Sequence, residues 1–374
     1  MRLAKVYGIE IKLHLSTLLI IGLVGFYAVN FYFSIFPTAS LLELLVVGII
    51  SGLIILFSIL IHELAHSIVA QKYGLKVLEI ELYLFGGVSK IEEEPTTPKS
   101  EMIIAVVGPL SSLIIGAIFL TFIYSIPIAL PAFIFIILLY TGISNISLAI
   151  FNLIPAFPID GGRILRAFLW YRRNDIVSAT KTASKVGSFF AYGLIAYGIL
   201  QIFLFGFLSG LWLIIIGSFL NNQTKQSYYQ ILNEMALSKI SALDMISMPR
   251  LEIPFDMLIS DAVREYFMLY KKSYFPVIQG DKIVGIIHID DIKKIPFELR
   301  SNYIVGYAMR NITNFPIIDE LDNGKEALKQ IRHLREKPYL VAVKDDNGYI
   351  LGLIGQDELS QSLRFCQLNS EKCL

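Results

Sequence analysis

An H-E-x-x-H motif, from His62 to His66, lies inside an apolar run that begins near Leu41. Ionisable side chains at the depth of a membrane helix are costly and mark functional sites by default. Positions i and i+4 of a helix share one face, so the two histidines can present imidazole nitrogens to one metal ion. The motif therefore predicts a metal site within a membrane helix, with a polar seam in a helix bundle as the structural alternative.

Glu63 projects beside the helix face that carries the two histidines. In water-soluble metallopeptidases the glutamate at this position accepts a proton from the water that attacks the peptide bond. Two imidazoles do not complete a catalytic zinc site, because such a site has three protein ligands and one open position. The motif therefore requires a third ligand elsewhere in the chain.

The composition indicates a membrane protein. The chain has 374 residues, of which 55% are hydrophobic and 17% are charged, and its mean hydropathy is +0.63. Residues 1 to about 222 carry nearly all of the long apolar runs, whereas 240–374 are typical of a soluble α/β segment rich in Lys, Asp and Glu. The net charge is only +1 and no basic block with interleaved aromatic residues appears, so we expect no nucleic-acid partner.

The apolar runs predict a polytopic α-helical membrane domain. With about 20 apolar residues needed for each span, we expect six transmembrane helices, at 13–36, 41–70, 101–124, 128–154, 183–204 and 208–222. Lys and Arg precede the first span and occur after the second and fourth, whereas the other three connections contain neither. The positive-inside rule then predicts a multi-pass protein of the cell membrane with both termini in the cytoplasm.

The third metal ligand is expected at Asp160. It follows the fourth predicted span, which ends on the same side of the membrane as the H-E-x-x-H helix, whereas Glu43 lies four to five helical turns from the motif. Pro155 and Pro158 break the helix before Asp160, and irregular backbone at membrane depth is tolerated only inside protein or beside a wet cavity. An interfacial turn or a helix cap is the alternative interpretation of this segment.

At these residues the chain resembles the site-2 protease family, which are intramembrane zinc metalloproteases with H-E-x-x-H on one transmembrane helix and N-x-x-P-x-x-x-x-D-G on a later one. The second motif is matched at Asn152, Pro155, Asp160 and Gly161. The likeness covers roughly residues 1–222, although many members carry P-x-P-P-L where this chain has P-A-F-P-I at 155–159. Gly108-Pro109 also looks like a family feature, for which a helix kink is a sufficient explanation.

The resemblance implies a function for each of these residues. It implies one zinc ion per chain, held by His62, His66 and Asp160, with Glu63 as the general base. It further implies that Asn152 hydrogen-bonds the substrate or the developing oxyanion, as a neutral donor can do.

A segment with strand-forming residues at 79–91 separates the second and third spans, and it reads as a hairpin or sheet. A transmembrane substrate must unwind before cleavage, and pairing with a sheet edge would satisfy its freed backbone groups. We therefore expect Phe85, Gly86, Gly87 and Val88 to bind substrate, unless the segment only packs against the helices.

The remainder of the chain contains a weak duplication, with similar segments at 274–292 and 338–359. Each reads as strand, tight turn, strand and helix, and the pair resembles tandem CBS domains. The expected organisation is a transmembrane zinc metalloprotease domain at 1–222, a linker at 223–243, a first CBS domain at 244–300, and a second CBS domain with a tail at 301–374. The cytoplasmic part is thus expected to be α/β.

CBS pairs often bind adenine nucleotides through a Thr or Ser followed by an Asp. The matching positions here are His288 with Asp291 and Gly355 with Glu358. Asp291 keeps the acid of the first site, but neither copy keeps the hydroxyl. A module for homodimerisation or gating is therefore favoured over a nucleotide site.

The sequence as a whole predicts an intramembrane zinc metalloendopeptidase that cleaves transmembrane segments of other proteins within the lipid bilayer. The alternative is a CBS-regulated ion transporter or channel that uses the His and Asp side chains as an ion site. That alternative predicts paired broken helices in two related halves, and residues 1–222 contain no such repeat. A catalytically silent zinc scaffold is disfavoured because Glu63 is intact.

Overall fold

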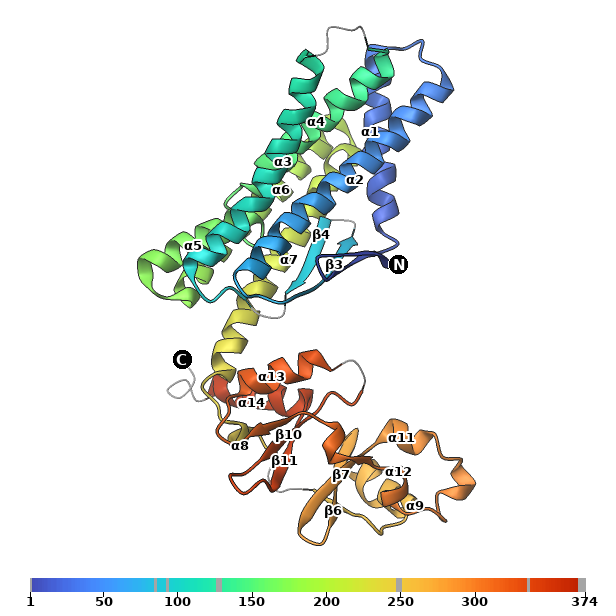
Figure 1. The fold of residues 1–374 in the computed structure, drawn as a ribbon, viewed down its shortest axis with the longest axis vertical. Coiled ribbons are helices and arrows are strands. Elements are labelled where there is room, and N and C mark those ends of the chain that lie inside the picture. The colour runs from blue at the N-terminus through green and yellow to red at the C-terminus, as the bar shows by residue number, and fades with distance from the viewer. Residues whose placement is uncertain are drawn as a thin grey trace. The chain divides into compact units, whose positions relative to one another are not determined.

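The computed structural model describes residues 2–83, 86–91, 94–125, 130–246, 251–334 and 337–368. The chain divides into two compact units, Met1–Tyr229 and Gln230–Leu374. Figure 1 shows the first unit as a bundle of long helices with a small sheet, and the second as an α/β module.

Long apolar helices form most of the first unit. Five of them, in the part of the chain that is described, are long and apolar enough to cross a membrane: α1 (Thr17–Ile35), α2 (Leu41–Lys72), α3 (Pro98–Ser125), α4 (Ala132–Asn152) and α6 (Ile176–Phe205). The amphipathic α5 (Asp160–Arg173) and the long α7 (Phe207–Leu237) complete the unit. The prediction of a polytopic helical protein is confirmed, while the expected span at 208–222 falls in α7, which is not among the five.

Glu43 caps the N-terminal end of α2. The Ser40 hydroxyl accepts a hydrogen bond from the Glu43 N–H at 3.3 Å, and the Glu43 carboxylate accepts one from the Ser40 N–H at 2.8 Å. This reciprocal capping box satisfies two donors that the first turn of a helix leaves unpaired. Glu43 therefore serves the helix end rather than the metal site.

The small sheet has the order β1-β2-β3-β4. Its strands are β1 (Arg2–Val6), β2 (Ile9–Leu13), β3 (Val77–Tyr83) and β4 (Gly86–Ile91), and all neighbours are antiparallel except β2 and β3. The hairpin expected at 79–91 is confirmed as β3 and β4. The two N-terminal strands were not expected, because residues 2–13 are short and partly charged. β4 has only one neighbour, so it forms an edge of the described sheet.

The second unit contains two sheets, with the orders β5-β6-β7-β8 and β11-β10-β9. The strands are β5 (Ile253–Pro254), β6 (Tyr274–Gln279), β7 (Lys282–His288), β8 (Arg310–Asn311), β9 (Ile317–Asp319), β10 (Val341–Lys344) and β11 (Ile350–Ile354). The helices are α8 (Ala242–Met245), α9 (Ile259–Ala262), α10 (Met268–Tyr270), α11 (Ile289–Lys293), α12 (Val305–Ala308), α13 (Gly324–His333) and α14 (Gln356–Leu368). A π-helical turn (Val263–Phe267) precedes α10.

The duplication expected in this unit is visible in its topology. β6 and β7 form an antiparallel hairpin followed by α11, and β10 and β11 form another followed by α14. The linker expected at 223–243 is helical as far as Leu237, where α7 ends.

Helices α1 and α2 approach each other closely where Gly25 of α1 faces Gly48 of α2. A Cβ atom on Gly25 would lie 2.7 Å from the Gly48 carbonyl oxygen, which is backbone and cannot move aside easily. Small residues at such a crossing allow membrane helices to gain van der Waals contact. Gly22, one turn earlier on α1, has no such neighbour within 4 Å.

We expect Gly25→Leu to push α1 away from α2 and to destabilise the protein by about 1–3 kcal/mol, the usual cost of overpacking. Thermal unfolding in detergent measures this effect. Gly22→Leu is the matched control and should unfold near the wild-type temperature. Equal unfolding temperatures for the two variants would contradict the packing described here.

Candidate metal centre

Three side chains from distant parts of the sequence meet beneath α3. His62 and His66 come from α2, and Asp160 is the first residue of α5. The Nε2 atoms of the two histidines lie 3.2 Å apart, and each lies 3.2 Å from Oδ2 of Asp160. All three residues are at most 8% exposed. The structure thus brings together the three residues expected to bind metal.

The donor set and the space around it fit a zinc ion. Ligands about 2.0–2.1 Å from a tetrahedral zinc lie about 3.3 Å from one another, close to the spacing of these atoms. Helix α3 leaves room here, because a Cβ on Gly108 would lie 2.0 Å from His66 Nε2 and 2.7 Å from His62 Nε2. Any larger residue at this position would occupy the space in front of both nitrogens.

Hydrogen bonds from α3 orient the two imidazoles. His66 Nδ1 lies 2.6 Å from the Ile104 carbonyl oxygen, which can only accept, so Nδ1 carries the proton. In the neutral ring, Nε2 is then left with its lone pair toward the cluster. His62 Nδ1 lies 3.0 Å from Ser112 Oγ, two turns further along the same helix. In metal sites of other proteins, similar hydrogen bonds to the outer nitrogen of a histidine fix the orientation of its ring.

Glu63 lies on α2 under strand β4. The Ser89 hydroxyl donates to Glu63 Oε2 at 3.1 Å and also lies 3.1 Å from the Ser67 hydroxyl. A Cβ on Gly87 would lie 2.3 Å from Cγ of Glu63, so only glycine lets the strand pass this close. The glutamate and the strand expected to bind substrate are therefore in direct contact.

The other predicted substrate residues are placed only in part. Gly86 and Gly87 open β4, opposite Tyr83 and Leu82 of β3. The backbone of Val88 belongs to the same strand, but its side chain and the whole of Phe85 lie outside the described residues.

Asn152 is the last residue of α4, and its Nδ2 donates to the Leu148 carbonyl at 3.0 Å. Within the described ranges no hydrogen bond joins its side chain to His62, His66 or Asp160.

Asp291 is buried in the second unit and is held by two cations. Arg310 donates to both of its carboxylate oxygens, at 2.8 and 2.9 Å, and Lys294 donates at 2.8 Å. Burial alone would raise the pKa of Asp291, but the hydrogen bonds and charges of Arg310 and Lys294 outweigh it and lower that pKa. The Asp291 carboxylate is therefore ionised, and its negative charge is balanced by Arg310 and Lys294 of the same unit.

Glu358, the matching acid of the second copy, also accepts hydrogen bonds within the same unit. Its Oε2 accepts from the Gly355 N–H at 3.0 Å and from the Tyr274 hydroxyl. Burial and the charge of Glu358 raise the pKa of Tyr274, so this hydroxyl stays protonated and donates. Both acids of the predicted nucleotide sites thus have partners of their own.

A buried ion pair that the sequence analysis did not identify joins α3 to α5. Arg166 Nε donates to Glu101 Oε1 at 2.6 Å, and its Nη2 donates to Glu94 at 3.1 Å. The guanidinium also lies 4.8 Å from the centre of the Phe157 ring. Because α3 carries the partners of the histidines and α5 begins with Asp160, this ion pair holds the Asp160 carboxylate in place relative to the two imidazoles.

Comparison with known proteins identifies the family. The model of peptidase family M50 matches residues 51–128 and 128–195, and the CBS domain model matches 245–298. The zinc metalloprotease MJ0392 of Methanocaldococcus jannaschii is 30% identical over 372 residues, which cover 99% of this chain and 98% of that protein. The chain belongs to peptidase family M50.

The chain is also similar to a second curated relative and to a solved structure. Rip3 of Mycobacterium tuberculosis is 29% identical over 318 residues, covering 81% of this chain and 78% of that protein. The solved site-2 protease from Methanocaldococcus jannaschii is 30% identical and covers 60% of this chain and 94% of that one, with a TM-score of 0.43.

This M50 peptidase is an intramembrane zinc metalloprotease that carries a CBS domain and acts on membrane proteins in the lipid bilayer. The predicted family and the predicted zinc metalloprotease activity are confirmed. The transporter or channel alternative is not supported.

We expect Gly108→Ala to lower zinc affinity about tenfold or more, because its methyl group would enter the space between the two Nε2 atoms. Gly193→Ala on α6 is the matched control, since a Cβ there meets nothing within 4 Å. Zinc retained by purified protein during titration with a chelator measures the difference. Wild-type retention by Gly108→Ala would show that the metal is bound elsewhere.

We expect Arg166→Gln to destabilise the protein by about 3–5 kcal/mol, because it leaves Glu101 charged and buried without its partner. Arg173→Gln, at the exposed end of the same helix, should cost less than about 1 kcal/mol. Thermal unfolding in detergent compares the two variants. Similar unfolding temperatures would mean that the buried pair does not hold α5.

Proposed function

We propose that His62, His66 and Asp160 hold the single catalytic zinc ion of this peptidase and that Glu63 is its general base. The observation that carries the proposal is the triangle of donor atoms, each 3.2 Å from the other two. When bound, zinc polarises the scissile carbonyl and makes a water molecule more acidic.

The residues of the chain then have separate tasks. Glu63 accepts the proton of the attacking water and returns it to the leaving amine, while the Ser89 hydroxyl orients its carboxylate. Asn152 donates to the developing oxyanion after its amide exchanges the Leu148 carbonyl for the substrate. The fixed hydrogen bonds of the two imidazoles keep the ligand geometry constant during the reaction.

The edge strand β4 is the proposed binding site for the unwound substrate. Residues Phe85 to Val88 would pair with the substrate backbone, because β4 has only β3 as a neighbour in the described sheet. The contact between β4 and Glu63 would bring a peptide paired at this edge close to the general base. This arrangement satisfies backbone groups that unwinding exposes within the membrane.

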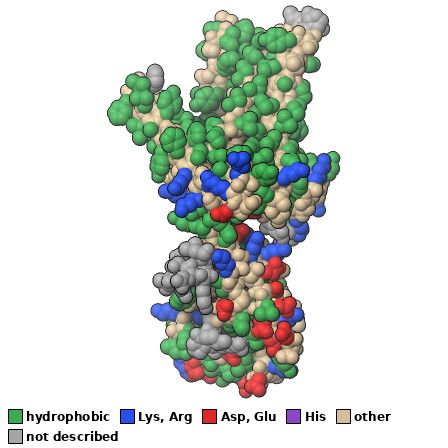
Figure 2. Space-filling model, turned by 90° about the vertical axis from the view of Figure 1, so that its left-hand side faces the viewer, with side chains coloured by type: hydrophobic (Ala, Val, Ile, Leu, Met, Phe, Trp, Pro, Cys, Tyr) green, Lys and Arg blue, Asp and Glu red, His purple; other side chains and the backbone are tan. Residues whose placement is uncertain are grey.

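The proposed topology is multi-pass with both termini in the cytoplasm. Figure 2 shows Lys and Arg side chains gathered at one end of the apolar surface of the helical unit. The positive-inside rule assigns that end to the cytoplasm. α7 would supply the sixth span through residues 208–222.

The C-terminal unit is proposed to act as a dimerisation and gating module. We place the protease domain at 1–222, a connecting segment at 223–243, and the CBS copies at 244–300 and 301–374. An adenine nucleotide would have to displace Arg310 from Asp291 or Tyr274 from Glu358, which argues against a nucleotide site.

Glu63→Gln should keep its zinc and lose cleavage of a model single-span substrate by about 100-fold or more, because the amide cannot accept a proton. Glu43→Gln on the same helix is the control and should cleave normally. Zinc content and cleavage are measured on the same preparations. Normal cleavage by Glu63→Gln would refute the general-base role.

AMP or ATP at about 1 mM should leave the unfolding temperature within about one degree, because a nucleotide that does not bind the folded state cannot stabilise it. Arg310→Gln, which removes one of the two cations that hold Asp291, is compared under the same conditions. A rise of several degrees for the wild type would instead establish a nucleotide site.

A further inference from the structure

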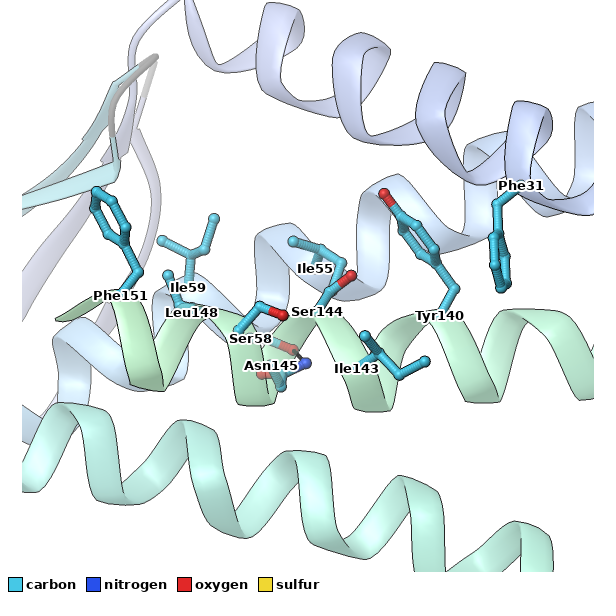
Figure 3. Close-up of a pocket in the computed structure, with 11 residues that line it drawn as sticks. Phe31, Ile55, Ser58, Ile59, Tyr140, Ile143, Ser144, Asn145, Leu148 and Phe151 are labelled. Atoms are coloured by element: carbon cyan, nitrogen blue, oxygen red, sulfur yellow. Dashed lines mark hydrogen bonds between the residues drawn. The ribbon is translucent and has the colours of Figure 1, made fainter. Parts of the chain in front are cut away.

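A groove of about 490 Å³ lies between α1, α2 and α4, within the size range of ligand-binding pockets, roughly 300–1,000 Å³. Figure 3 shows its lining side chains, with Phe31 and Tyr140 at one end and Phe151 at the other. Ile143 and Phe151 in its wall are 47% and 41% exposed, so the groove is open at the membrane-facing surface.

The groove is apolar apart from one polar stretch in its middle. That stretch consists of Ser58 on α2 and Ser144, Asn145 and Ser147 on α4. Polar side chains inside a membrane are expensive and usually functional. Asn145 is fully buried, and its environment decides what the groove can bind.

The hydrogen bonds of Asn145 leave its oxygen without a donor. Nδ2 donates to the Thr141 carbonyl at 2.9 Å and to Ser58 Oγ at 3.2 Å, so both amide protons are used. Ser58 in turn donates to the Ile54 carbonyl at 3.0 Å. Oδ1 of Asn145 has no hydrogen-bond partner among the described residues. An unpaired acceptor in hydrocarbon costs free energy that an entering donor would recover.

The acceptor lies next to the proposed catalytic centre. Ser58 precedes His62 by one turn on α2, which is about 6 Å along the helix axis. An extended chain covers that distance in about two residues and a helix in about four. A peptide cleaved at the metal centre could therefore reach Asn145 with a residue two to four positions from its scissile bond.

We propose that this groove binds the transmembrane segment of the substrate and that Asn145 selects segments carrying Ser, Thr, Asn or Gln two to four residues from the scissile bond. The inference rests on the proposed catalytic role of His62, Glu63, His66 and Asp160. A lipid chain is the other candidate occupant, but it has no hydrogen-bond donor for Oδ1. The headgroup donors of a lipid would lie at the interface, while Asn145 is seven residues, or about 10 Å, from the end of α4.

The first test scans a model single-span substrate with Asn in place of Leu at successive positions around the cleavage site. Wild-type protein should cleave the Asn substrate about threefold to tenfold faster, in kcat/KM, at one position in the predicted window. Asn145→Leu should lose this preference, so that its kcat/KM values for the Asn and Leu substrates differ by less than about twofold. Asn30→Leu on α1 is the matched control, because the Asn30 side chain is exposed and bonds its own helix at Phe26.

A preference that persists in Asn145→Leu, or no preference at any position, would overturn the proposal. A second measurement does not depend on cleavage or on the folding of Asn145→Leu. A photoreactive benzoylphenylalanine replaces Ile143 in a Glu63→Gln background and should crosslink to the added substrate. The same probe at Ile118 of α3, which is 60% exposed and outside the groove, should not.

Crosslinking to lipid alone would assign the groove to lipid, and equal substrate capture at both positions would show that the groove does not bind the substrate selectively; either result overturns the proposal. The catalytic proposal and the groove proposal can be refuted independently. Normal cleavage by Glu63→Gln would refute the catalytic role of Glu63. If Glu63→Gln is inactive as expected, but the wild type shows no Asn preference and the Ile143 probe captures no substrate, only the proposal that the groove binds substrate is refuted.

Discussion

The hydrogen bond between His66 and the Ile104 carbonyl is the contact on which the candidate metal centre most depends. A carbonyl oxygen can only accept, so this bond determines which imidazole nitrogen carries the proton and which faces Asp160. Because Ile104 and Gly108 lie one turn apart on α3, the same helix both orients the histidine and leaves room in front of it. The spacing of His62 and His66 alone would not provide either condition.

Within the hydrocarbon region, every buried polar group needs a partner from the protein, and these partners organise the helical unit. Glu101 and Arg166 neutralise each other between α3 and α5, and Ser89 serves Glu63 from the sheet. The first contact holds α5, which begins with Asp160, against α3, and the second holds Glu63 of α2 against β4. The rigid centre is therefore a product of tertiary contacts across the whole unit.

The sequence predicted that His62, His66 and Asp160 meet, because short local patterns mark each part of this group. His62 and His66 are four residues apart, so a helix places them on one face. Pro155 and Pro158 predict a helix break directly before Asp160. The sequence could not show that Arg166 meets Glu101, 65 residues away, or that Gly108 faces the two imidazoles rather than only kinking α3. Nor could it show that Asn145 meets Ser58, since such contacts depend on how the helices cross.

The central claim is that two imidazoles and one carboxylate from α2 and α5 bind a single zinc ion. Zinc K-edge X-ray absorption of the purified, zinc-loaded protein tests it without reference to activity. The account predicts nitrogen and oxygen donors at about 2.0–2.1 Å, with multiple-scattering features of two imidazoles and a changed spectrum in Asp160→Asn. Sulfur donors, a single imidazole, or a spectrum unaffected by Asp160→Asn would contradict it.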